Sequence, residues 1–200
     1  MEDAPRQLTL QGRRLVLGVT GSIAAYKAVS LLRAFTGRGA SVAVVMTQAA
    51  TRFVAPLTFE VLSGERVTTD LFEAHQEMKH LSLPEQADAI VVAPATANFL
   101  AKAAVGLADD VLSTMLLTAR CPLIVAPAMD VDMWAHPTVI EHQKTVMRRR
   151  IANSAKRQHV ATTAVVESHG AGKKKTPEWM VPSVVGQFRG HQLTEDDIPA

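Results

Sequence analysis

Short apolar runs alternate along this chain with longer segments in which apolar residues recur at helical spacing. Residues 14–20 form an almost continuous apolar run that stops at Gly21, which is typical of a strand buried on both faces. Apolar residues then recur every three to four positions over residues 23–35, which predicts a helix that ends at Gly37. Residues 41–46 repeat the strand pattern. These segments predict a βαβ unit with two parallel strands.

The alternation continues to about Val146 and predicts the fold class. Further strands are expected at residues 87–93 and 122–126, with a weak final one at 160–166, and further helices at 48–53, 56–63, 96–105, 109–119 and from Asp132 or His136 onward. Strands that alternate with helices predict an α/β protein with a doubly wound parallel sheet, Rossmann- or flavodoxin-like, in three layers.

The same pattern divides the 200 residues into three parts. Residues 1–12 are expected to be a short mobile lead, residues 13–147 one folded domain, and residues 148–200 an atypical basic tail that is poorly ordered or weakly structured. The net charge of the whole chain is only +2, but basic clusters at residues 148–150, 156–157 and 173–175 lie in that tail. A solvated tail is a more frequent explanation of such clusters than nucleic-acid binding, and we expect no nucleic-acid partner.

Composition narrows the class of protein further. Hydrophobic residues make up 48% of the chain and aromatic residues 4%, which favours close packing of helices on a sheet over an aromatic-rich β-sandwich. Cys121 is the only cysteine, so neither an intrachain disulfide nor a cysteine-based metal cluster is expected, and no metal site is predicted. We expect a cytoplasmic protein, because no signal segment and no apolar run of about 20 residues is visible.

Three of the predicted strands end in small and polar residues, at 19–23, 93–98 and 125–130. The carboxyl ends of parallel strands lie at one edge of a sheet, and ligands bind just outside that edge. One shared pocket is therefore expected rather than three separate features.

The first strand end has the features of a phosphate site. Gly21, Ser22 and Ile23 precede a helix, where free N–H groups, the positive end of the helix dipole and a serine hydroxyl favour an anion. The dinucleotide fingerprint is absent, so a mononucleotide fits better than NAD. Thr47, at the end of the second strand, is a further donor. An ordinary capped helix explains the first three residues equally well, and a satisfied turn hydroxyl is the more frequent explanation of Thr47 taken alone.

The other strand ends suit a flat ring and a substrate. Pro94 and Ala95 let a ring approach the backbone, while Thr96 and Asn98 offer a hydroxyl and an amide to ring heteroatoms. Packing and capping explain the segment Met129–Trp134 equally well, and Asp109 and Asp110 are interpreted first as helix caps. His80, in a segment taken as a loop, is an acid–base candidate, although it is one of seven histidines.

Together these motifs resemble the homo-oligomeric flavin-containing cysteine decarboxylases, most closely the coenzyme A branch of that family. The resemblance covers roughly residues 13–145. It is carried by five ordered motifs, at residues 18–27, 78–83, 93–98, 108–114 and 126–134.

The resemblance implies FMN as the cofactor, a flavoprotein domain over residues 13–147, and a homotrimer or dodecamer. The cofactor would contact Gly21, Ser22, Ile23, Thr47, Pro94, Ala95, Thr96, Asn98 and Ser113, and the substrate would contact Asn98, Ala128, Met129, Asp130 and Met133. His80 matches the catalytic histidine of the family and would act on flavin held by a neighbouring chain.

The implied reaction is decarboxylation of a C-terminal cysteinyl group. Flavin oxidation of the cysteine CH₂–SH to a thioaldehyde creates an electron sink for the loss of CO₂, and the reduced flavin then returns the hydride. In the coenzyme A branch this converts 4'-phosphopantothenoylcysteine to 4'-phosphopantetheine. The alternatives are a peptidyl-cysteine oxidative decarboxylase, a more remote flavin prenyltransferase and a non-catalytic flavin-fold regulatory protein.

Two departures from the family pattern stand out. The family usually has asparagine where this chain has Asp130, and an amide donates to a carboxylate whereas an ionised aspartate only accepts. No cysteine follows Cys121, so the lid cysteine of the coenzyme A branch has no counterpart, and impaired activity is expected. The last quarter is interpreted as a divergent, truncated or frame-shifted version of the family's lid region.

Overall fold

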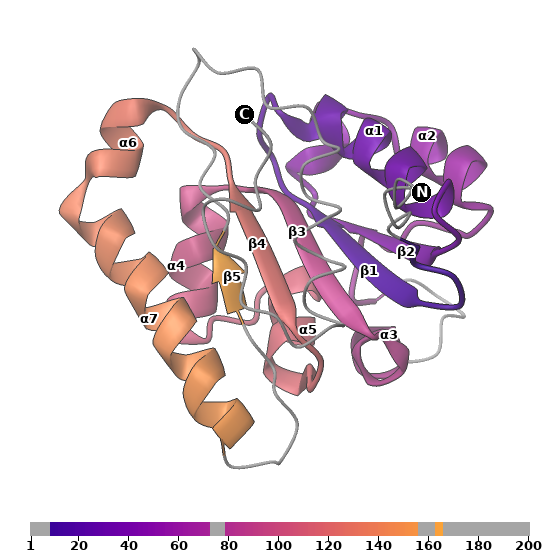
Figure 1. Cartoon of the computed structure of the whole chain (residues 1–200). Helices are drawn as coiled ribbons and strands as arrows, with labels where there is room; N and C mark the ends of the chain where they lie inside the picture. Colours follow the sequence, from indigo (N-terminus) through magenta and orange to yellow (C-terminus); the bar gives the residue numbers. More distant parts are fainter. Residues whose placement is uncertain (1–8, 73–78, 156–162, 166–200) are drawn as a thin grey trace, which may run out of the picture.

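The computed structural model describes residues 9–72, 79–155 and 163–165, and these form a parallel α/β sheet with helices on both faces (Figure 1). The strands of the described segments lie in the order β2-β1-β3-β4-β5, and every neighbouring pair is parallel. Their bounds are β1 Arg14–Val19, β2 Ser41–Met46, β3 Ala89–Ala95, β4 Leu123–Pro127 and β5 Thr163–Val165. The predicted fold class is confirmed.

Side-chain alternation along the strands divides the core into two layers. In β1, Leu15, Leu17 and Val19 pack on the face covered by α1 and α2, whereas Val16 belongs to the opposite layer. That opposite layer contains residues of α4, α5 and α7, with Leu83 of α3 packed against it. Strands buried on both faces explain why the sequence shows continuous apolar runs rather than an alternation of apolar and polar residues.

The helices follow the predicted order, except that α3 is added and the last expected helix is divided into α6 and α7. Their bounds are α1 Ala25–Thr36, η1 Ala50–Arg52, α2 Pro56–Ser63, α3 Lys79–Gln86, α4 Ala97–Val105, α5 Val111–Thr118, α6 Val131–Ala135 and α7 Pro137–Ala155. Helix α3 was not predicted, because its segment is polar and contains Pro84. In the described segments no helix combines the length and apolarity that a membrane span requires.

Several boundaries differ from the sequence-based expectations by one or more residues, and β3, for example, is Ala89–Ala95 rather than 87–93. Helix α1 starts at Ala25 rather than Ile23, after a turn in which Ser22 accepts a hydrogen bond from the N–H of Ala24 (3.3 Å). Leu10, in the segment expected to be a mobile lead, is buried with 1% of its surface exposed. Helix α7 runs through residue 147, where the domain was expected to end.

The strand order places a topological switch point between β1 and β3. The chain moves from β1 to β2 on one side and then returns past β1 to form β3 on the other. The loops that follow β1 and β3 therefore leave the sheet in opposite directions, and doubly wound proteins bind their ligands in the crevice at this part of the carboxyl edge.

Candidate functional site

The loops at the carboxyl ends of β1, β3 and β4 are tied together by hydrogen bonds. The Thr20 hydroxyl donates to the carbonyl oxygen of Pro94 (2.7 Å) and accepts from the N–H of Thr96 (3.1 Å). The N–H of Ala128 donates to the carbonyl oxygen of Ala95 (3.0 Å), and the Ser22 hydroxyl donates to that of Ala128 (3.5 Å). The shared edge expected from the sequence is thus one connected structure.

The turn between β1 and α1 presents unused donors. Among the described residues, the N–H groups of Gly21 and Ile23 have no hydrogen-bond partner. Gly21 and Ser22 are half-buried, and Ile23 is 76% exposed. Free N–H groups beside the amino end of a helix attract anions.

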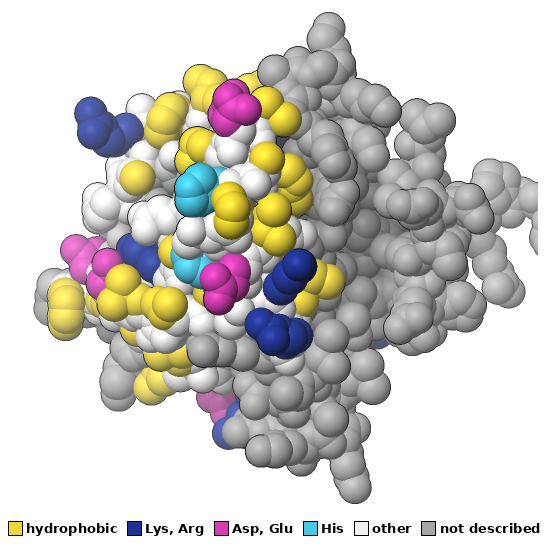
Figure 2. Space-filling model, turned by 90° about the vertical axis from the view of Figure 1, so that its left-hand side faces the viewer, with side chains coloured by type: hydrophobic (Ala, Val, Ile, Leu, Met, Phe, Trp, Pro, Cys, Tyr) yellow, Lys and Arg dark blue, Asp and Glu magenta, His cyan; other side chains and the backbone are white. Residues whose placement is uncertain are grey.

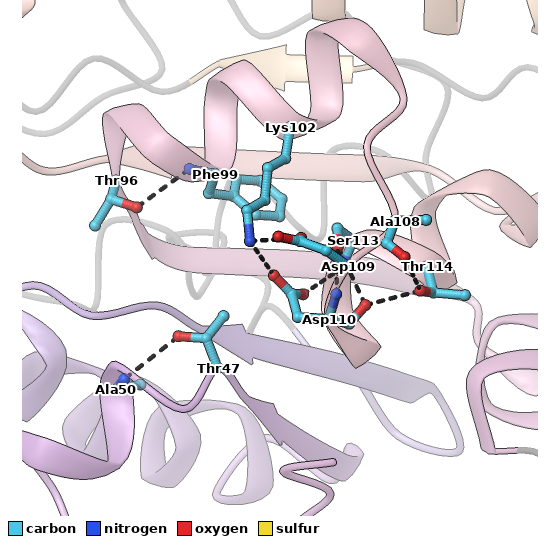
Figure 3. A network of polar contacts seen from close by, with 10 residues as sticks. All are labelled: Thr47, Ala50, Thr96, Phe99, Lys102, Ala108, Asp109, Asp110, Ser113 and Thr114. Atoms are coloured by element: carbon cyan, nitrogen blue, oxygen red, sulfur yellow. Dashed lines mark hydrogen bonds and ion pairs between the residues drawn. The ribbon is translucent and has the colours of Figure 1, made fainter. Parts of the chain in front are cut away.

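Close packing of two loops brings the end of β2 to this turn. A Cβ at Gly21 would lie 2.4 Å from the Cβ of Ala49, so only glycine fits there. Thr47 lies two residues before Ala49, donates its N–H to the carbonyl oxygen of Val19 (3.0 Å) and accepts at its hydroxyl from the N–H of Ala50 (3.3 Å; Figure 3). The Thr47 hydroxyl has an acceptor role here and retains its own proton to donate.

The end of β3 combines a buried backbone with an exposed amide. Pro94 and Ala95 are buried, and the Ala93–Pro94 peptide bond is cis. Thr96 caps α4, as predicted, by accepting from the N–H of Phe99 (3.3 Å). Asn98 is exposed in the first turn of α4, and its side chain has no hydrogen bond within the described segments. Its amide is therefore available to a ligand.

A charged cluster links α4 to α5 (Figure 3). The Lys102 ammonium lies 2.6 Å from the Asp109 carboxylate and 2.7 Å from that of Asp110. Burial lowers the pKa of Lys102, but hydrogen bonds and charge from the two aspartates outweigh it, and the pKa is raised. For Asp110, burial alone would raise the pKa. Hydrogen bonds from Lys102 and Ser113 and the charge of Lys102 outweigh burial, so the pKa of Asp110 is lowered. Both groups are stabilised in their charged forms.

Ser113 belongs to this cluster. It forms a capping box with Asp110, whose carboxylate accepts from the Ser113 N–H (2.8 Å) while the Ser113 hydroxyl accepts from the Asp110 N–H (3.2 Å). The hydroxyl also donates to the Asp110 carbonyl oxygen (3.1 Å), and the residue is 2% exposed. The cap predicted at Asp110 is confirmed, and the expected flavin contact of Ser113 competes with these local bonds.

The loop after β4 leads into the short helix α6. Asp130 caps this helix by accepting from the N–H of Asp132 (2.9 Å), and its side chain is exposed. Met129 is half-buried against the core, whereas Met133 is 49% exposed. Figure 2 shows the face of the molecule on the side of α6 and α7, where hydrophobic, histidine and charged side chains are mixed.

Helix α3 places His80 away from this edge. Asp88, two residues beyond α3, donates its N–H to the carbonyl oxygen of Arg14 (2.8 Å) at the start of β1. Figure 1 accordingly shows α3 near the amino ends of β1 and β3. His80 lies in the first turn of α3, and its side chain is outside the described part of the structure. The helix replaces the loop that was expected around this residue.

The sequence did not reveal the contacts of Thr20 at the carboxyl edge or those of Lys102 in the neighbouring charged cluster. Thr20 was taken as the polar end of a strand, and its partners lie 74 and 76 residues away. Gly106, which was expected to separate two helices, lies between Lys102 and its partners Asp109 and Asp110. A lysine before this break and two aspartates after it were the only signal in the sequence. No group of three or more potential metal ligands occurs in residues 9–72, 79–155 and 163–165.

Comparison with known proteins gives matches over most of the chain. A family model described as "Flavoprotein" matches residues 4–189. The coenzyme A biosynthesis bifunctional protein CoaBC of Mycolicibacterium smegmatis (strain ATCC 700084 / mc(2)155) is 50% identical over 137 residues, which are 68% of this chain and 33% of that protein. The CoaBC protein of Bacillus subtilis (strain 168) is 48% identical over 132 residues, 65% of this chain and 32% of that protein. The chain thus spans about a third of the length of these curated relatives.

Two solved structures of decarboxylases also match this chain. The FMN-dependent cysteine decarboxylase SpaF is 35% identical, with a TM-score of 0.65, and the match covers 80% of this chain and 86% of that chain. A cysteine-to-serine mutant of a PPC decarboxylase is 25% identical, with a TM-score of 0.72, and the match covers 90% and 99% of the two chains.

Proposed function

This chain belongs to the Flavoprotein family, and from that premise we propose that it is an FMN-dependent carboxy-lyase that converts 4'-phosphopantothenoylcysteine to 4'-phosphopantetheine in coenzyme A biosynthesis. The observation that carries the proposal is the joining of the loops after β1, β3 and β4 at the β1–β3 switch point. The relatives named for coenzyme A biosynthesis, at up to 50% identity, support the choice of substrate.

The residues of the edge fit FMN. Its phosphate requires donors without competing carboxylates. The turn after β1 supplies the N–H groups of Gly21 and Ile23, which have no partner among the residues that the structure describes, beside the hydroxyl of Ser22. The Thr47 hydroxyl, at the end of β2, is a neutral donor on the other side of the Gly21–Ala49 contact. We assign these four residues to the phosphate.

The ribityl chain and ring would lie along residues 94–98, with Asn98 offering its amide and Ser113 a weaker contact because its hydroxyl is already bonded. Bound FMN supplies a two-electron oxidation of the cysteinyl CH₂–SH and its reversal. The protein orients the cysteinyl end of the substrate with Asn98 and with the loop after β4, from which we assign Ala128, Met129, Asp130 and Met133 to the substrate.

His80 is assigned as the catalytic acid–base of a neighbouring subunit, in a homotrimer or dodecamer. The position of α3 towards the amino ends of the strands supports this, because it separates His80 from the flavin edge of its own chain. Mixing two inactive variants, His80→Asn and Asn98→Ala, and allowing subunits to exchange should restore activity. Mixtures that stay inactive despite proven exchange would contradict a shared site.

The function is tested by adding FMN and substrate to the purified protein. We expect a yellow protein with absorbance near about 370 and 450 nm and release of CO₂ from 4'-phosphopantothenoylcysteine. His80→Asn should keep the colour and lose CO₂ release. A folded protein that stays colourless with excess FMN would refute the proposal.

Peptidyl-cysteine decarboxylation is the second candidate, favoured by the 35% identity to the cysteine decarboxylase SpaF. A peptide ending in cysteine would use the same FMN site but release an ene-thiol. Comparing kcat/KM for such a peptide and for 4'-phosphopantothenoylcysteine decides between the two. A preference for the peptide would replace the substrate proposed above without changing the cofactor.

A further inference from the structure

Thr20 lies in the strand end at residues 19–23 that the sequence indicated, but its hydrogen-bond partners could not be predicted from the sequence. The residue is 2% exposed, and it follows β1 directly. The β1–β3 ladder runs in register from Leu15 opposite Ala89 to Gly18 opposite Val92, and the same register sets Thr20 opposite Pro94. The backbone N–H of Thr20 donates to the Pro94 carbonyl oxygen at 3.3 Å, and the Thr20 hydroxyl donates to the same oxygen at 2.7 Å.

The same hydroxyl also accepts from the N–H of Thr96 at 3.1 Å. Thr96 in turn caps α4, and Asn98 stands in the first turn of that helix. On the other side, the Thr20 carbonyl accepts from the N–H of Ser22 at 2.9 Å, in the turn assigned to the phosphate. Thr20 therefore joins the two loops, through its side chain on the side of β3 and through its backbone carbonyl on the side of the phosphate turn.

We infer that Thr20 is a positioning residue for FMN, which sets the distance between the phosphate turn at Gly21–Ile23 and the ring-binding segment at 94–98 without touching the cofactor. This inference rests on the proposed function. Removing this buried hydroxyl is costly, because the N–H of Thr96 would lose its acceptor and the Pro94 carbonyl would keep only the 3.3 Å bond from the Thr20 N–H.

The test uses two pairs of variants that differ by one hydroxyl: wild type against Thr20→Val, and Thr20→Ser against Thr20→Ala. Flavin fluorescence quenching on titration of apoprotein gives the FMN dissociation constant. We expect both hydroxyl-free variants to bind FMN about tenfold more weakly than their partners, since one unpaired buried group corresponds to that factor. Thr20→Ser should stay within about threefold of wild type, which shows rescue by the hydroxyl alone.

Thr68 provides the matched control. It is also 2% exposed, but its hydroxyl has no hydrogen-bond partner within the described part of the chain, and its backbone pairs with β2. Thr68→Val should bind FMN like wild type.

The outcomes separate a failure of the proposed function from a failure of the role inferred for Thr20. Wild type that binds no FMN refutes the proposed function, whereas wild type and Thr20→Val with equal affinities refute the role of Thr20 alone. If both hydroxyl-free variants fail to fold as apoproteins by circular dichroism, the hydroxyl serves the fold rather than the cofactor, and the inference is overturned. A loss in Thr68→Val equal to that in Thr20→Val would also overturn it.

Discussion

The hydrogen bonds of Thr20 and the ion pairs of Lys102 join parts of the same domain by opposite means. Thr20 is neutral, almost fully buried, and bonded to residues 74 and 76 positions away. Lys102 is charged, its side chain is 15% exposed, and its carboxylate partners lie within eight positions. The neutral cluster crosses the switch point, whereas the charged cluster joins two successive helices.

The difference follows from what each place has to accommodate. A crevice for an anionic phosphate is best lined by N–H and O–H donors, because a carboxylate there would repel the ligand and a permanent ion pair would occupy the donors. The junction of α4 and α5 has no such constraint, and its charges stabilise each other. We therefore expect changes in the first cluster to alter ligand affinity and changes in the second to alter stability.

The largest effect is expected from Gly21→Ala, which should disrupt the turn next to the hydrogen bonds of Thr20. The new Cβ would collide with Ala49, and its backbone carbon at 3.0 Å cannot withdraw as a flexible side chain would. We expect a loss of stability of about 2 kcal/mol, as in other overpacked sites. FMN binding should weaken roughly tenfold, which corresponds to about 1.4 kcal/mol of lost positioning.

Two further variants make this first test specific. Ala49→Gly in the same chain should restore part of the affinity, because it removes the 2.4 Å contact. Gly64→Ala, whose φ of +75° also strains an alanine but whose Cβ would meet nothing within 4 Å, should lower stability in urea titrations and leave FMN binding unchanged. Equal FMN losses in Gly21→Ala and Gly64→Ala would show that general destabilisation explains both.

Variants that remove the ion pairs of Lys102 should change folding stability but not FMN affinity. Lys102→Met leaves two neighbouring carboxylates without their cation and should cost about 1–2 kcal/mol of folding stability. Asp110→Asn retains a capping side chain and should cost about 1 kcal/mol. The double variant should reveal a coupling of about 0.5–1 kcal/mol in urea unfolding. FMN affinity should stay within about twofold, and a tenfold loss would mean that the charged cluster also shapes the crevice.

The charged cluster should also give stability a pH dependence that the neutral one lacks. The lowered pKa of Asp110 contributes stability that is present above its ordinary value of 3.8 and is lost as the pH falls through the folded-state value. The raised pKa of Lys102 contributes stability that is present below 10.5 and is lost as the pH rises through its folded-state value. Unfolding followed from acid to alkaline pH should show both losses. Asp110→Asn should reduce the acid one, and an unchanged acid limb would contradict this origin.

The smallest structural effect is expected at Asp130, which caps α6 from an exposed position. Asparagine caps helices as well as aspartate does, so Asp130→Asn should change stability by less than about 0.5 kcal/mol. Turnover of 4'-phosphopantothenoylcysteine should be kept or raised, because an amide can donate to the substrate carboxylate. Complete loss of CO₂ release with intact FMN binding would contradict the interpretation that an amide suits the substrate carboxylate at this position.

The two clusters also show what the sequence makes predictable. Strand β2 was predicted at its observed bounds, because a strand buried on both faces leaves an apolar run with clear ends. The cap at Asp110 was found because its partner is three residues away. Thr20 was missed because its bonds depend on the register of two strands far apart in sequence, which no local pattern encodes. Helix α3 was missed because it has few apolar residues and an internal proline.

Gly18, in β1, limits how the core of this protein can be redesigned. Its absent side chain leaves a notch on β1 that Leu112 of α5 fills, since a Cβ there would lie 2.7 Å from one Leu112 methyl carbon and 3.2 Å from Val92. The volumes at positions 18 and 112 are therefore complementary, and enlarging one demands shrinking the other. If the sheet of a related protein replaced this one, the residues at positions 18 and 112 would have to be exchanged together.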